Sequence, residues 1–150
     1  MSVSTVKARL AEIEEEIAGI NQAYAQAPLS LPASDLPAFV NFAGQSTHDW
    51  RIAGSDTDSE TRLYLLRLYV APLSTGQPGE IERLCEPFLT SVRDAFAARP
   101  SLGRLTSVQM AVFLGDGGPA VLLYGGTRYV GVEFKLQVME LVRVIYADYE

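Results

Sequence analysis

The pattern of apolar and polar side chains from Thr61 to Gly79 predicts a long strand that turns directly into a helix. Successive side chains of a strand point to opposite sides of its sheet. From Arg62 to Val70 one side carries Tyr64, Leu66, Leu68 and Val70, and the other carries Leu63, Leu65, Arg67 and Tyr69. Both sides are mostly apolar, whereas a strand with one face in water alternates apolar and polar residues. We therefore expect a cover on each side of this strand.

The helix that follows Pro78 is predicted to provide one cover, because its apolar residues recur at helical spacing along one face. These residues are Ile81, Leu84, Cys85, Phe88, Val92, Ala95 and Phe96. Pro87 lies in the middle of this helix, where it removes one backbone hydrogen bond. We expect the helix to lie over the side of the strand that carries Tyr64 and Leu66.

A second helix is predicted at the N-terminus, from about residue 4 to residue 26. Its apolar residues alternate at steps of four and three and are Val6, Leu10, Ile13, Ile17, Ile20 and Tyr24. Two apolar positions in seven form a stripe as narrow as the seam of a coiled coil. This helix therefore either lies on the sheet of its own chain or pairs with another subunit.

The candidate subunit interface combines this stripe with the second side of the long strand. Its residues are Val6, Leu10, Ile13, Ile17, Leu63, Leu65, Arg67 and Tyr69. A lone arginine on an apolar face needs a carboxylate or access to water. We therefore expect Arg67 at a boundary between subunits or between layers.

The other segments predict shorter elements. Three prolines in residues 27–37 indicate an extended linker, and residues 38–43 and 47–52 read as a hairpin that turns through Gly44. Residues 105–114 alternate as a half-buried strand. One face carries Thr106, Val108, Met110, Val112 and Leu114, and the other carries Ser107, Gln109, Ala111 and Phe113. Residues 120–124 form another strand.

The last strand, from residue 129 to residue 138, has the cleanest alternation in the chain. Glu140 then falls on its apolar face, which predicts a bulge or bend near Met139. Together the elements predict a single α+β domain over residues 1–150, with the N-terminal helix at about 4–26, the linker at 27–37 and the core at 38–146. Its sheet is mainly antiparallel and covered by the amphipathic helix.

Composition narrows the classes of function. The chain has 150 residues and a net charge of −6, and the clustered Lys and Arg of a nucleic-acid-binding surface are missing. Cys85 is the single cysteine, which excludes an internal disulfide and a cysteine-rich zinc site. No uncharged apolar run reaches about 18 residues, so we expect no membrane span.

Candidate chemistry is sparse. His48 is the only histidine, and Cys85 lies on the apolar face of its helix. Asp56, Asp58 and Glu60 alternate as in a calcium loop, but the loop's glycine and final glutamate are missing. The glycine-rich segments 115–118 and 125–126 read as turns, because neither precedes a helix with a phosphate-loop lysine. We therefore predict no catalytic, cofactor-binding or metal-binding residue, and no enzyme activity.

Several segments together resemble the small tail-terminator, tail-completion and minor tail proteins of long-tailed bacteriophages. They are Leu36-Pro37-Ala38, the strand TRLYLLRLYVAP with Gly76 after it, the helix ending in Arg99-Pro100 and Leu102-Gly103, and the stretch from Tyr124-Gly125-Gly126 to Phe134. The resemblance covers residues 36–138 and does not include the N-terminal helix.

This resemblance implies an α+β subunit that assembles into a ring, usually sixfold, which terminates or completes the tail tube at the head–tail connection. Loops and edge strands would contact neighbouring subunits, tail-tube proteins and head-connector proteins. DNA would pass through the ring without sequence-specific binding. The protein would be made in the host cytoplasm and located in the virion tail, with no membrane partner. The alternative hypothesis is a non-enzymatic dimeric adaptor or binding module that associates through its N-terminal helix.

Overall fold

A computed structural model describes residues 2–49, 57–74 and 79–143 and has the α+β fold predicted from the sequence. The helices are α1 (Val3–Glu15), the short 3-10 helix η1 (Ala33–Asp35) and α3 (Glu80–Ala97). The strands are β1 (Gln22–Tyr24), β2 (Ala38–Asp49), β3 (Thr57–Pro72), β4 (Val108–Asp116), β5 (Ala120–Tyr124) and β6 (Thr127–Arg143).

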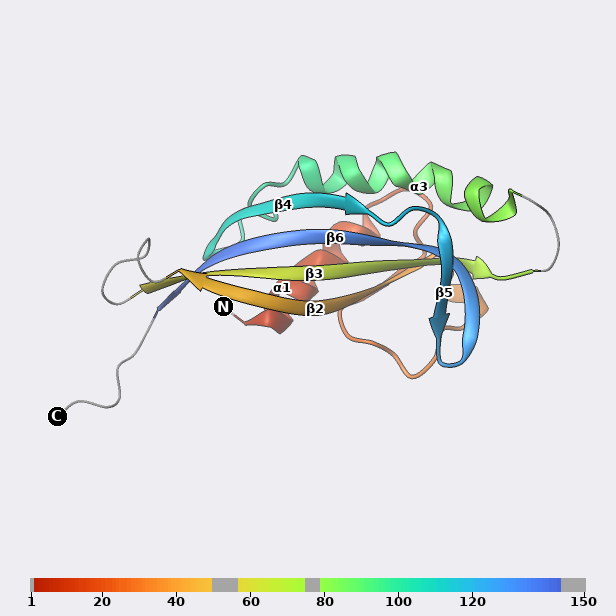
Figure 1. The fold of residues 1–150 in the computed structure, drawn as a ribbon, viewed down its shortest axis with the longest axis horizontal. Coiled ribbons are helices and arrows are strands. Elements are labelled where there is room, and N and C mark those ends of the chain that lie inside the picture. The colour runs from red at the N-terminus through yellow and green to blue at the C-terminus, as the bar shows by residue number, and fades with distance from the viewer. Residues whose placement is uncertain (1, 50–56, 75–78, 144–150) are drawn as a thin grey trace.

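The strands form one sheet in the order β1-β2-β3-β6-β4, and β5 pairs with the beginning of β6. All neighbouring strands are antiparallel except β1 and β2, which are parallel. In Figure 1 the long strands run across the view, α1 lies behind them, and β5 crosses in front. β3 and β6 are the central strands, and their pairing extends from Thr57 and Arg143 to Pro72 and Tyr129.

Both helices cover the same face of the sheet. α1 lies against β1 and β2, whereas α3 lies against β4 and β6. The side of β3 that carries Tyr64 and Leu66 is buried in one cluster with Leu10 of α1 and with Phe88 and Val92 of α3. The predicted cover over this side of β3 is therefore correct, but the two helices share it.

The N-terminal helix ends at Glu15 and not near residue 26. Gly19 follows with a φ of +89°, a conformation that suits glycine and ends the helical path. The chain then runs back as β1, and the side-chain amide nitrogen of Asn21 donates to the carbonyl of Leu36 at 2.6 Å. Tyr24 thus lies on a strand, because parallel pairing with β2 replaces the helical turns that its spacing predicted.

The hairpin predicted through Gly44 is also wrong, since residues 38–49 form the single strand β2. The register between β2 and β3 shifts between Ala43 and Ser46, so Gly44 lies in a bulge. Arg62 donates to the Gly44 carbonyl at 2.9 Å, which satisfies a backbone group that the bulge removes from the ladder. Trp50 and Ile52, which were assigned to this hairpin, lie outside the described residues.

A bulge occurs opposite Met139, but in β4 and not in β6. Val108 faces Glu140 and Met110 faces Met139, so Gln109 is an extra residue in β4. An extra residue exchanges the two faces of the strand beyond it. Ala111 is consequently buried, while Met110 and its neighbours on the same side face outward.

Candidate subunit interface

Within the described part of the chain, the second apolar side of β3 is covered only at one end. A cluster of buried residues lies there between the sheet, the 27–37 linker and β5, and it comprises Leu31, Leu36, Ala38, Val40, Tyr69 and Tyr129. The Tyr69 ring packs edge-on against Tyr124 and Tyr129, with centroids 5.4 and 5.6 Å away. The hydroxyl of Tyr124 donates to the carbonyl of Pro28, which fixes the linker over this cluster. Tyr69 is therefore buried by its own chain.

The remainder of this side faces outward, and no described helix lies on it. We call it the open face, and its residues are Leu63, Leu65, Arg67, Met110, Val112, Leu114, Lys135, Gln137 and Met139. On the edge strand β4, Met110 is 50%, Val112 40% and Leu114 52% exposed. Leu63 and Leu65 of β3 are half-buried. An apolar surface of this kind marks a site of interaction in many soluble proteins.

Arg67 lies on the open face and has the carboxylate that its position called for. Its Nε donates to Oε2 of Glu133, on β6, at 2.7 Å. Its guanidinium also lies over the Phe42 ring, 5.0 Å from the centroid. The positive charge is thus paired across two strands, and the side chain remains about one-third exposed.

A shallow hollow of about 340 Å³ lies in the open face between β2, β3, β6 and β4. It is lined by Gln45, Ser46, Thr47, Thr61, Leu63, Leu114 and Gln137. This lining is neutral and mixes apolar side chains with hydroxyl and amide groups. It suits contact with another polypeptide surface more than binding of a charged small molecule.

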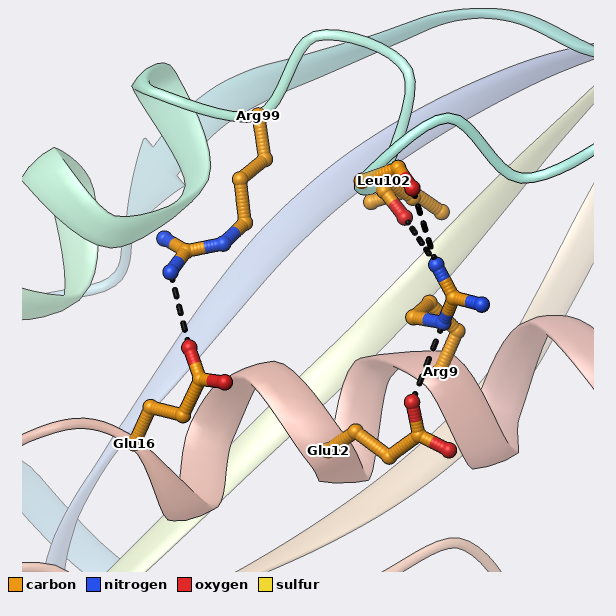
Figure 2. Close-up of polar contacts among 6 residues, drawn as sticks. Arg9, Glu12, Glu16, Arg99 and Leu102 are labelled. Atoms are coloured by element: carbon orange, nitrogen blue, oxygen red, sulfur yellow. Dashed lines mark hydrogen bonds and ion pairs between the residues drawn. The ribbon is translucent and has the colours of Figure 1, made fainter.

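The α1 part of the predicted interface lies elsewhere. Val6, Leu10, Ile13 and Ile17 are 0–7% exposed and belong to the main core of the chain. Figure 2 shows that α1 is also held by contacts with the end of α3 and with the loop that follows it. Arg9 donates to the carbonyls of Leu102 and Gly103 at 2.8 and 3.2 Å, and Arg99 donates to Glu16 at 2.8 Å. The stripe is covered by its own chain and leaves no coiled-coil seam for a second subunit.

Cys85 and His48 have different contacts in the structure. The Cys85 thiol is buried and lies 3.6 Å from the carbonyl of Gly131. Burial raises the pKa of this thiol to about 11, so it is protonated near neutral pH. His48, on β2, lies 3.4 Å from a carboxylate oxygen of Glu60, and Glu60 also pairs with Arg62.

Asp58 and Glu60, interpreted from the sequence as part of a solvated acidic turn, lie instead in strand β3, paired with β6. Asp56 lies outside the described residues. Asp116 accepts a hydrogen bond from the Gly118 amide at 2.7 Å, which closes a local turn. Among the residues with described positions, no group of three or more metal-binding side chains occurs, and no described helix is long and apolar enough to cross a membrane.

The sequence prediction did not include Met110, Val112 and Leu114 in the interface. The run of uncharged residues that contains them is visible in the sequence. The bulge that turns these three side chains outward does not change the alternation of apolar and polar residues. Of the eight predicted interface residues, the structure places Leu63, Leu65 and Arg67 together on the open face. The chain matches no protein-family model, and a comparison with curated proteins also gives no match.

Proposed function

We propose that this protein is a structural, non-enzymatic subunit of a phage or prophage tail, forming a ring that terminates or completes the tail tube. Two lines support the proposal. The segments between residues 36 and 138 resemble that family, and the described helices leave the open face of the sheet uncovered. The open face is the single observation that carries most weight, because a ring subunit needs surfaces that only a neighbour covers.

The edge strand β4 adds to this argument. Exposed edge strands are usually protected from pairing by lysine, proline or very short length. Residues 108–115 contain neither charge nor proline. The Ala111 amide already donates to the carbonyl of Pro100 at 2.6 Å, so residues 112–116 are the part of this edge that could meet a neighbour.

Strand direction is compatible with a head-to-tail contact. β2 and β4 run in opposite directions, because the three pairings that connect them are all antiparallel. Two copies in the same orientation, placed edge to edge, would therefore set β4 of one copy antiparallel to β2 of the next. β1 pairs only with Ala38–Val40, so the outer edge of β2 continues beyond it. A contact between two different surfaces closes into a ring when the rotation between copies closes.

Electron microscopy tests the proposed function directly. The purified protein, alone or mixed with tail tubes, is expected to give rings with a central hole in negatively stained images. A protein that stays monomeric and does not associate with tail tubes would overturn the proposal.

Leu114→Lys tests the role of the open face. The side chain is about half exposed, so the fold should tolerate lysine with a change within about 0.5 kcal/mol. Repeated at each contact of a ring, the added charges should weaken association by about tenfold or more, equivalent to about 1.4 kcal/mol per contact. Analytical ultracentrifugation measures this change.

Ala97→Lys is the matched control, because Ala97 is exposed on α3, in the helical layer. It adds the same charge away from the open face and should leave association unchanged. Equal association by the two variants would show that the open face is not the contact surface.

A further inference from the structure

Glu14 is a carboxyl group enclosed in the core between α1 and the sheet. Glu14 and Asn41 of β2 are both 0% exposed. The Asn41 amide nitrogen donates to Oε1 of Glu14 at 2.7 Å and to the carbonyl of Tyr24 at 3.1 Å. One amide group thus connects α1, β1 and β2.

Two buried oxygen atoms in this arrangement have no partner. They are Oε2 of Glu14 and Oδ1 of Asn41. If Glu14 were ionised, both atoms would be acceptors without a donor, and a buried unsatisfied polar atom is destabilising. A proton on Oε2 turns that oxygen into a donor, and Oδ1 is an unpaired acceptor in the same pair of residues. A cyclic acid–amide pair then satisfies both side chains.

Among the residues that the structure describes, the charged and titratable groups around α1 supply no cation to this carboxyl. On α1, Lys7 donates to Gln26 at 3.0 Å, and Glu15 adds a second negative charge. The Arg9 and Arg99 side chains are directed to the contacts in Figure 2. On β1 the Tyr24 hydroxyl donates to Asp35. Glu140 of β6 and Arg62 and Glu60 of β3 act electrostatically on the Tyr64 hydroxyl of β3.

We propose that Glu14 is a protonated carboxylic acid in the folded protein, that its Oε2 donates to Asn41 Oδ1, and that this pair is a pH-sensitive latch holding α1 on β2. This inference does not depend on the proposed function. Burial raises the pKa of Glu14 well above the ordinary carboxyl value, while the Asn41 hydrogen bond opposes the shift. The stabilisation is complete below the ordinary carboxyl pKa and is lost as pH rises through the raised pKa.

Glu14→Gln is the decisive variant, because its carboxamide reproduces the protonated acid. Its nitrogen can donate to Asn41 Oδ1, and its oxygen can accept from the Asn41 amide. Between about pH 5 and pH 8 the folding equilibrium constant of the wild-type protein should fall by up to tenfold per pH unit relative to Glu14→Gln. Urea titrations across this range measure both proteins, and their difference isolates the ionisation of Glu14 from other groups.

Glu12→Gln serves as the matched control, since Glu12 lies on the same helix with its side chain 69% exposed. Its pH dependence should run parallel to that of the wild type. Carboxyl carbon NMR of the unmutated protein gives a second readout, in which the Glu14 carboxyl is expected to be protonated at about pH 6. Parallel pH profiles for wild type and Glu14→Gln, or an ionised Glu14 at that pH, would overturn the proposal. The NMR result decides the question even if Glu14→Gln fails to fold.

Discussion

Leu10→Asp is expected to abolish folding of the chain. Leu10 is 0% exposed and packs in the main core with residues of β3, α3 and β6. Loss of a buried leucine side chain alone costs about 2–5 kcal/mol, and a buried carboxylate without a partner adds to this loss. The free energy of unfolding of a natural domain is about 5–15 kcal/mol. The circular dichroism spectrum of this variant at 25 °C should therefore be that of an unfolded chain. Heating should show no cooperative unfolding transition.

Ala8→Asp is the control for this prediction, because Ala8 lies on the same helix and is exposed. It should fold and melt within a few degrees of the wild type. A folded, monomeric Leu10→Asp protein would mean that α1 is dispensable for the core. That outcome would restore the hypothesis of a dimer formed through the N-terminal helix.

The apolar stripe of α1 alone could not show whether this helix lies on its own sheet or pairs with another subunit. The reason is that polar residues share the buried face. Lys7 is 9% exposed and Glu14 is 0% exposed, beside Val6 and Leu10. The buried face is therefore wider than the apolar residues indicate. A count of apolar positions measures hydrophobicity and not burial, and it fails where a polar group finds a partner inside the fold.

The two apolar sides of β3 were a reliable signal, because a strand that is apolar on both sides must be covered on both. The segments that cover the second side of β3 could not be predicted from the sequence. The 27–37 linker was recognisable from its prolines, yet its packing over Tyr69 depends on contacts between residues almost 100 positions apart, such as Tyr124 with Pro28. Periodicity reports local geometry and carries no information about such pairs.

The faces of β4 show a different limit. One extra residue at Gln109 places Val108 and Met110 on opposite faces, although they are two positions apart. Alternation assumes an uninterrupted strand, so Met110, Val112 and Leu114 looked equivalent to Val108. The candidate interface on β4 became visible only once the register with β6 was known.

Gly131→Ala is the second substitution with a large expected effect, because Gly131 allows close approach of the two central strands. The register between β3 and β6 shifts between Tyr69 and Ala71, directly opposite this glycine. A Cβ at position 131 would lie 2.2 Å from the carbonyl oxygen of Leu68 and 2.9 Å from Cδ1 of Leu122. The leucine side chain can rotate away, but the carbonyl is part of the β3 backbone. Relief therefore requires the strands to separate.

We expect Gly131→Ala to reduce the free energy of unfolding by about 3 kcal/mol, the upper part of the usual range for overpacking. For a domain of this size the melting temperature should fall by roughly 6–12 °C. Gly117→Ala is the matched control, since its added Cβ meets no atom within 4 Å. Scanning calorimetry of both variants measures the difference. Equal melting temperatures would mean that β3 can shift at its bulge without loss of the flanking pairs, and the open face next to it would then be adjustable on binding and not preformed.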